Sequence, residues 1–286
     1  MTSCHRAVVV GGGAVGGMFA QLLRDGGASV TVVDVAARGD LRADVTAPSP
    51  ELIAVIGAAD TVLLALPEAV TLKALPEVTA VMAAGALLVD TSSVKAGIVD
   101  AGPPGREWVS VNPMFAPSLG MRGRPVAAIV AHGGERVEGF LAEITGWGGR
   151  VVRMSAVEHD RIAAVTQSMT HAAILAFGLA VRDLGLPLET LAATAPPPHQ
   201  SMLALLARLM SQSPEVYWDI QAANPHAAHG RAALADGLRR LADLVDAGDT
   251  HGFDDALGEL RSLFGDDLAI HRDRCARMFA ILQDEP

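Results

Sequence analysis

The sequence predicts an α/β domain with a parallel sheet, followed by an all-helical domain. Short apolar runs that end in polar residues alternate with helical segments up to residue 154. After Ser155 no strand-like alternation occurs, and the remaining segments have helical periodicity. We therefore expect two domains, 1–154 and 155–286.

The first element is a buried strand over 7–10 that runs into a glycine-rich turn and then a helix over 18–23. Three glycines in the turn have G-x-G-x-x-G spacing: Gly11, Gly13 and Gly16. They allow a tight turn, close approach of a pyrophosphate, and close packing of the helix on the strand. The free N–H groups near Ala14 and Val15 would face that pyrophosphate. The turn therefore predicts a dinucleotide site.

The second strand, over 29–33, ends in Asp34. A carboxylate at this place accepts the ribose hydroxyls of NAD and repels the 2′-phosphate of NADP. Arg38 follows closely and keeps NADP open as the less favoured choice. NAD is the predicted cofactor.

Further strands are expected along the first domain, at 61–66, 86–90, 108–111, 126–130 and 150–154. In a doubly wound sheet, the turn after the first of these lies over the cofactor. Leu66 and Pro67 are therefore expected to neighbour the nucleotide.

The second domain begins with a capping box, in which Ser155 and Glu158 would serve the first turn of a helix that ends near Leu184. Pro196–Pro198 form a rigid break. Four more helices are expected, at 201–210, 215–223, 231–247 and 252–278. This half is either a bundle or the dimerisation half of a two-domain dehydrogenase.

Bulk properties exclude several classes of partner. The formal net charge of −10 argues against binding nucleic acid or an anionic membrane. Cys4 and Cys275 lie far apart without metal-ligand spacing, which predicts free thiols in the cytoplasm and no metal site. The most apolar stretch, 162–181, carries several polar residues, so we expect a helix of a soluble protein and no membrane span.

Two strand ends carry residues suited to chemistry. Lys95 is one of only two lysines among 22 basic residues, and it follows the strand that ends at residue 90. Lys95 is either an ammonium that the site needs or a lysine on the surface. Nearby Ser93 is either a site residue or a helix cap. Asn112 ends the next strand and could present its amide to a cleft or simply form a turn.

The helical half offers a second set of candidates. His171 and Gln167 lie on one helix face, where a histidine is either a site residue or a satisfied core residue. Arg208 is the only charge in its helix, and its guanidinium suits a carboxylate or a place on the surface. His199 and Gln200 precede it and could line the same cleft.

Together these segments resemble the prephenate dehydrogenase family, which includes arogenate and 4-amino-4-deoxyprephenate dehydrogenases. The matching segments follow the family order: Gly11–Gly17, Asp90–Lys95, Asn112–Phe115, Ser155–Asp160, Gln167–Gly178 and Ala207–Tyr217. Each is weak alone, and the combination is specific. The resemblance implies a nucleotide domain, a helical domain that forms a homodimer, and a substrate with two carboxylates bound in the cleft between the domains.

The same resemblance implies roles for single residues. The family removes hydride from C4 of a cyclohexadiene and carbon dioxide from C1, which gives an aromatic pyruvate. Ser93 and Lys95 match residues beside the reacting ring and the nicotinamide. His171 matches a substrate-pocket histidine, and Arg208 matches the arginine that binds carboxylate.

Asn112 departs from the family, which has a histidine at this place as the base for the C4 hydroxyl. An amide cannot act as a base near neutral pH. A C4 amine needs no such base, because its lone pair can expel the hydride. We therefore favour 4-amino-4-deoxyprephenate as the substrate. Gln200 is a softer departure, since some members carry arginine there.

The sequence leaves other functions open. One is an ordinary prephenate or arogenate dehydrogenase with His171 or His199 as base. A β-hydroxyacid or imine reductase shares the domain plan, but the segments around Lys95 and Arg208 speak against it. The alternative outside enzymes is a catalytically silent, nucleotide-binding regulator.

Overall fold

A computed structural model describes residues 5–36, 38–211 and 214–283. The chain divides into two compact units. The sheet unit comprises Met1–Ala163 and Ala222–Pro225, and the helical unit comprises Ala164–Gln221 and His226–Pro286. The division falls inside a long helix, whereas we expected it at the start of that helix, at 154/155. Cys4 and positions 212–213 lie outside the described residues, and Cys275 is a free thiol.

The sheet has eight strands in the order β3-β2-β1-β4-β5-β6-β7-β8. Their bounds are β1 Arg6–Val10, β2 Ser29–Asp34, β3 Leu41–Arg42, β4 Thr61–Leu64, β5 Leu87–Asp90, β6 Trp108–Pro113, β7 Pro125–His132 and β8 Arg150–Arg153. All neighbours pair in parallel except β6 and β7, which are antiparallel. The sheet is parallel as expected except at this one pair. Only a short segment with the 3₁₀ turn η1 (Pro117–Leu119) joins β6 to β7, and a parallel return needs a longer crossover.

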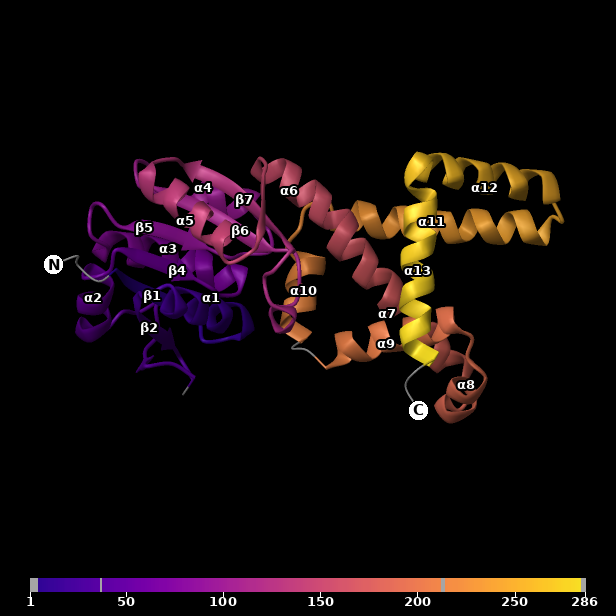
Figure 1. Ribbon diagram of the computed structural model, residues 1–286, viewed down its shortest axis with the longest axis horizontal. Helices are drawn as coiled ribbons and strands as arrows, with labels where there is room; N and C mark the ends of the chain where they lie inside the picture. Colours follow the sequence, from indigo (N-terminus) through magenta and orange to yellow (C-terminus); the bar gives the residue numbers. More distant parts are fainter. Residues whose placement is uncertain (1–4, 37, 212–213, 284–286) are drawn as a thin grey trace. The chain divides into compact units, whose positions relative to one another are not determined.

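Helices cover both faces of this sheet (Figure 1). Their bounds are α1 Ala14–Asp25, α2 Pro50–Gly57, α3 Glu68–Val81, α4 Ala96–Ala101 and α5 Glu135–Gly146. A further helix of this unit, α6 (Ala156–Ala163), packs against α4. Apolar side chains of α1 and α5 form one buried cluster with the strands, and those of α2, α3 and α4 form another. Because both faces are covered, β4 and β5 are buried along their whole length, as their continuous apolar sequences require.

The helical unit starts with η2 (Ala164–Met169), a π-helical segment that continues α6 into α7 (Thr170–Leu184). The other helices are α8 Leu188–Thr194, α9 Pro197–Met210, α10 Pro214–Ala222, α11 Ala227–Asp246, α12 Thr250–Phe264 and α13 Leu268–Gln283. The expected single helix over 252–278 is two helices, because the chain turns at Gly265 with φ of +53°. The prolines expected as a break follow the end of α8 and begin α9, where a missing N–H costs nothing.

One helix is apolar along most of its length. By length and composition alone, Ala156–Leu184 could cross a membrane, a test that core helices of soluble proteins also pass. Only 22% of its most apolar window is buried within one chain. Its α7 part packs against α9, and η2 packs against α11.

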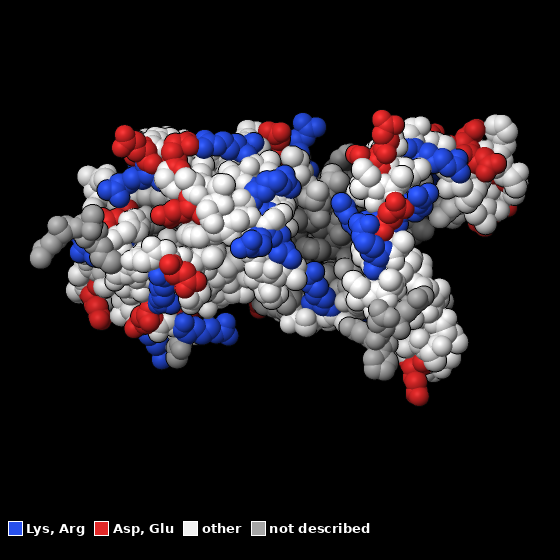
Figure 2. Space-filling model, in the orientation of Figure 1, with Lys and Arg blue, Asp and Glu red and all other residues white. Residues whose placement is uncertain are grey.

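Charged side chains of both signs are interspersed on the face of the sheet unit shown in Figure 2. Some form ion pairs, such as Arg24 with Asp40 at 2.8 Å. The excess of acidic residues is therefore spread among basic ones on this face.

Candidate active site

The glycine-rich turn between β1 and α1 has the geometry that its sequence predicts. Gly11 has φ of +104°, and a Cβ there would lie 2.2 Å from the carbonyl oxygen of Ala65. A Cβ on Gly16 would lie 1.9 Å from the carbonyl oxygen of Gly11. A Cβ on Gly13 would meet no atom within 4 Å, so this side of the turn is open to a ligand. The turn therefore needs glycine at Gly11 and Gly16 for packing, whereas Gly13, the middle glycine of the motif, leaves room.

The start of α1 and the end of β2 complete this corner. Gly13 is the N-cap of α1, and no side chain of the described residues caps it, so the first-turn N–H groups at Ala14 and Val15 can serve an anion. The Asp34 carboxylate accepts hydrogen bonds from the backbone N–H of Gly12 and of Ala36, both at 2.7 Å. These residues fit a dinucleotide, with the pyrophosphate at the helix start and a ribose near the carboxylate.

The turn after β4 lies against the glycine-rich turn. Ala65 provides the carbonyl that approaches Gly11, and Leu66 Cδ2 would lie 3.3 Å from a Cβ at Gly11. Pro67 is exposed and is the N-cap residue of α3. The hydroxyl of buried Thr71 donates to the carbonyl of Pro67 at 3.2 Å and holds this turn.

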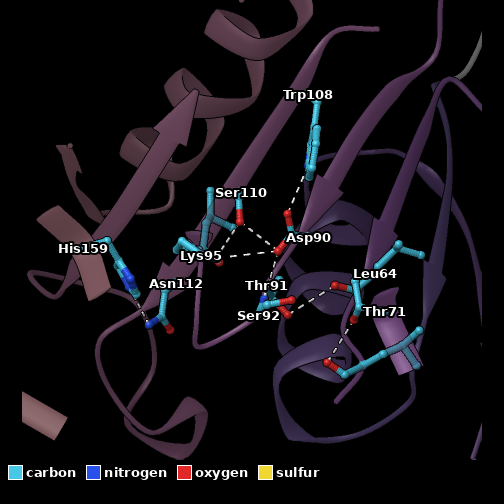
Figure 3. A network of polar contacts seen from close by, with 12 residues as sticks. Leu64, Thr71, Asp90, Thr91, Ser92, Lys95, Trp108, Ser110, Asn112 and His159 are labelled. Atoms are coloured by element: carbon cyan, nitrogen blue, oxygen red, sulfur yellow. Dashed lines mark hydrogen bonds and ion pairs between the residues drawn. The ribbon is translucent and has the colours of Figure 1, made fainter. Parts of the chain in front are cut away.

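A buried polar network lies at the carboxyl ends of β5 and β6 (Figure 3). Asp90, at the end of β5, is fully buried. Its carboxylate accepts from the backbone N–H of Ser92 at 3.1 Å, from the indole N–H of Trp108 at 3.0 Å and from the hydroxyl of Ser110 at 2.8 Å. These donors satisfy the carboxylate in the absence of water.

Lys95 is fully buried and joins this network. Its Nζ donates to Ser110 Oγ at 2.7 Å and to the carbonyl of Val111 at 2.9 Å, and it lies 3.7 Å from Asp90 Oδ1. Burial lowers the pKa of Lys95 from 10.5 to about 8, although the nearby carboxylate of Asp90 raises it. The surface alternative for Lys95 is wrong, and its ammonium holds the end of β6, next to Asn112.

Asn112 is buried at that end of β6. Its Nδ2 lies 3.0 Å from Nε2 of His159, a residue of α6. The other ring nitrogen, Nδ1, lies 2.9 Å from Asp160 Oδ1. Because an amide nitrogen only donates, Nε2 accepts here. The proton of the ring is therefore on Nδ1, which donates a hydrogen bond to Asp160. A chain of hydrogen bonds therefore runs in one direction, with Asn112 donating to His159 and His159 donating to Asp160.

Asp160 also ties α6 to the start of α4. Its carboxylate oxygens accept from the backbone N–H of Lys95 at 2.8 Å and of Ala96 at 2.9 Å. Burial raises the pKa of Asp160, but the hydrogen bonds from His159 and from these two amides outweigh it and lower the pKa. Asp160 thus caps α4, and Ser93, half-buried in the preceding turn, does not stand at the N-cap position.

The helical unit holds its own group of candidates. The His171 ring on α7 packs edge-on against Tyr217 on α10, with centroids 5.1 Å apart, and Phe177 packs against His199 on α9 at 5.4 Å. His171 Nδ1 and His199 Nε2 are buried without a hydrogen-bond partner among the described atoms. Burial lowers the pKa of His171, and the positive charge of Arg208 lowers it further. These two ring nitrogens are unused polar atoms of the kind that a ligand satisfies.

The remaining predicted residues of this unit lie on the same elements. Arg208 is exposed on α9. Burial raises the pKa of Tyr217, and the positive charge of Arg208 opposes this rise. Gln167 is half-buried in η2. Gln200 donates from Nε2 to the carbonyl of Ala195 at 3.0 Å, so it serves the turn between α8 and α9.

Sequence reasoning did not single out His159 and Asp160. They lie just after the capping box, where the hydroxyl of Ser155 accepts from the N–H of Glu158 at 3.2 Å as predicted. A histidine and an acid on the buried side of a helix start were the available signal, because such residues rarely lie in a core without a partner. In the described parts of the chain, no cluster of histidine, cysteine or acidic side chains is placed to hold a metal.

A glycine-rich turn, an acid after the second strand and a polar network at the strand ends define a nucleotide-dependent α/β enzyme with an added helical unit. Residues 19–124 match the nucleotide-binding domain of prephenate dehydrogenase, and residues 155–259 match its dimerization domain. The chain belongs to the prephenate dehydrogenase family, and it is a dehydrogenase.

Individual relatives agree with this assignment. The chain is 48% identical to 4-amino-4-deoxyprephenate dehydrogenase of Streptomyces pristinaespiralis, over 97% of both chains. It is 28% identical to the T-protein of Haemophilus influenzae, over 92% of this chain and 68% of that one. Prephenate dehydrogenase from Aquifex aeolicus, solved with hydroxyphenyl propionate and NAD+, has the same fold, with a TM-score of 0.72 and 19% identity over 91% of this chain and 96% of that one.

Proposed function

We propose that this enzyme carries out the NAD-dependent oxidative decarboxylation of 4-amino-4-deoxyprephenate to 4-aminophenylpyruvate. The proposal rests on Asn112, an amide at the strand end where the family has a histidine base. The relative from Streptomyces pristinaespiralis, with its printed activity and 48% identity, supports the same substrate.

The neighbouring imidazole does not replace the missing base. His159 lies directly beside Asn112, but its Nε2 lone pair already accepts the Asn112 amide, and its ring is 1% exposed. The buried network therefore offers no free proton acceptor through Asn112 or His159. This favours a substrate whose C4 substituent supplies its own electron pair.

The chemistry divides between cofactor, substrate and protein. NAD, when bound, supplies the hydride acceptor. The free amine on C4 pushes out the hydride with its lone pair, and loss of carbon dioxide from C1 returns two electrons to the ring, which becomes aromatic. No proton needs to leave during these steps. Asn112 accepts a hydrogen bond from the amine, and Lys95 holds the strand end that carries Asn112.

Arg208 is our candidate for binding a substrate carboxylate, since a guanidinium can form paired hydrogen bonds with it. His171 and His199 offer the unused ring nitrogens described above. We also propose Gln167 and Ser93 as substrate-site residues, on their match to the family segments. Gln200 is proposed with them because it neighbours His199 at the start of α9.

We further propose that the chain acts as a homodimer through its helical unit, in the cytoplasm. Few large side chains of that unit are buried in one chain, and several apolar ones are more than half exposed: Leu179, Leu184, Trp218, Leu238, Leu263 and Ile281. A second copy would cover such side chains. The match to a dimerization domain supports this arrangement.

The decisive experiment compares two substrates at equal concentration, with NADH formation followed at 340 nm. We expect kcat/KM for 4-amino-4-deoxyprephenate to exceed that for prephenate by about 100-fold, the scale of base assistance that an amide cannot give. A clear preference for prephenate would mean that the amine is not the recognised group. NADH formation from neither substrate would favour the silent regulator.

Replacing Asn112 with histidine should raise kcat for prephenate by about 10- to 100-fold, because it restores a base beside the C4 substituent. The new imidazole can donate to Nε2 of His159 and keep its other nitrogen free as an acceptor. Asn112→Gln is the matched control and should give no rise. An unchanged prephenate rate in Asn112→His would show that residue 112 does not face the reacting carbon.

A further inference from the structure

The direction of the hydrogen-bond chain through Asn112 has a consequence for substrate recognition. An asparagine amide is ambiguous, because its oxygen accepts, its nitrogen donates, and a half-turn about the last bond exchanges them. At Asn112 this ambiguity is removed. The nitrogen lies toward His159 at 3.0 Å, and Figure 3 shows the oxygen on the side away from the imidazole.

We propose that His159 is a positioning residue that, together with Asp160, turns the Asn112 amide so that its oxygen is offered to the substrate amine. This inference deepens the function proposed above and rests on it for the identity of the ligand. Its geometric part stands without a ligand. His159 does not touch the reacting atoms and acts only through Asn112.

Asp160 sets the direction of the hydrogen-bond chain. Its carboxylate is anchored by the N–H groups of Lys95 and Ala96 and can only accept a hydrogen bond from His159. The proton of the neutral imidazole is therefore held on Nδ1, and Nε2 is left with a lone pair. That lone pair accepts a hydrogen bond from the Asn112 N–H. If the amide were turned around, its oxygen would face the lone pair with no proton between them, and neither atom would be satisfied.

Protonation of His159 would reverse this arrangement. Its Nε2 would then donate, and the amide would turn to bring its oxygen to the ring. Asp160 on α6, Asp90 on β5 and Lys95 before α4 act on this imidazole. Burial lowers the pKa of His159 below its ordinary 6.5, with Lys95 lowering it further and the hydrogen bond to Asp160 opposing. The acceptor arrangement therefore persists at neutral pH and fails only on acidification.

The first test needs no substrate. In the whole protein labelled with ¹⁵N-histidine, the ring nitrogen shifts of His159 at pH 7.5 should show a neutral ring protonated on Nδ1, with His159→Gln used to assign the signals. A ring protonated on Nε2, or on both nitrogens, would overturn the inference whatever the substrate is.

The second test is a double-mutant cycle on whichever of the two substrates the wild-type enzyme oxidises. His159→Leu removes the acceptor for the amide, and we expect KM for the amino substrate to rise about 10-fold. In an Asn112→Ala background the same change should alter KM less than about 3-fold, since no amide is left to orient. Equal losses in both backgrounds would mean that His159 is merely structural.

His159→Gln is the conservative variant, because its amide oxygen can accept from Asn112 while its nitrogen donates to Asp160. We expect it to keep KM within about 3-fold of wild type and to show no rise in KM on acidification, whereas we expect such a rise in the wild type when His159 becomes protonated. If His159→Leu does not fold, this variant and the histidine spectra still decide. A His159→Gln variant as impaired as His159→Leu would contradict the inference. A prephenate preference with an intact cycle would instead overturn only the proposed substrate.

Discussion

Replacing Lys95 with methionine is expected to lower kcat by at least about 100-fold and the free energy of unfolding by about 3 kcal/mol. The stability loss follows because the buried carboxylate of Asp90 loses its cation. The activity loss follows because Lys95 holds the carbonyl of Val111, next to Asn112, and a displacement of about 1 Å at a reacting group can cost that factor. Urea unfolding and NADH formation measure the two effects.

Two variants make this result interpretable. Lys73→Met changes the chain's other lysine, which is exposed on α3, and should leave both quantities unchanged. The double variant Lys95→Met with Asp90→Asn removes both charges and should regain much of the lost stability without regaining activity. A single Lys95→Met variant as stable and active as wild type would refute the role given to the buried ammonium.

The pKa of Lys95 adds a dependence on pH. Below about pH 8 the lysine is charged in both the folded and the unfolded protein, so the cost of burying its charge is present in full. Between about 8 and 10.5 the unfolded chain holds a proton that the folded protein has released, so this group makes stability rise with pH. Activity should instead fall above about pH 8, as the cation that orders β6 disappears.

Gly16→Ala is expected to weaken NAD binding by about 100-fold, equivalent to about 3 kcal/mol. The added Cβ would lie 1.9 Å from the carbonyl oxygen of Gly11, a backbone atom, so the turn that faces the pyrophosphate must shift. Overpacking of this kind should also lower the free energy of unfolding by about 1–3 kcal/mol. Calorimetric titration with NAD and thermal unfolding test both effects.

Gly17→Ala is the matched control, one residue further along α1, where a Cβ meets nothing within 4 Å. Because alanine is the better helix former, it should stabilise the protein by about 0.5–1 kcal/mol and leave NAD affinity unchanged. Equal NAD affinity in the two variants would show that the glycine turn does not hold the nucleotide.

The sequence predicted much of this architecture because its signals are local. The glycine spacing before α1, the acid after β2 and the capping box at Ser155 each involve residues close in the chain. The antiparallel return of β7 was missed because its apolar run looks the same in either direction. Gly265 was passed over because a helical pattern continues on both sides of it.

Only part of the site could be predicted from the sequence. Lys95 and Asn112 stood out because each follows a strand, where the ends of parallel strands come together. Their partners did not, because contacts such as Asn112 with His159 and Lys95 with Asp160 join residues distant in sequence. The use of Lys95 as an internal support of β6 likewise depends on its depth in the fold, which no local pattern reveals.

The double hold on Asp34 has a consequence for the thermodynamics of cofactor binding. With backbone N–H groups of Gly12 and Ala36 each bound to its carboxylate, this side chain is immobilised before any ribose arrives. Rotamer freedom worth about 0.5–1.5 kcal/mol is thus lost during folding and is not lost again on association. Preorganisation of this kind favours a rigid recognition of the ribose diol, with little induced rearrangement of the protein.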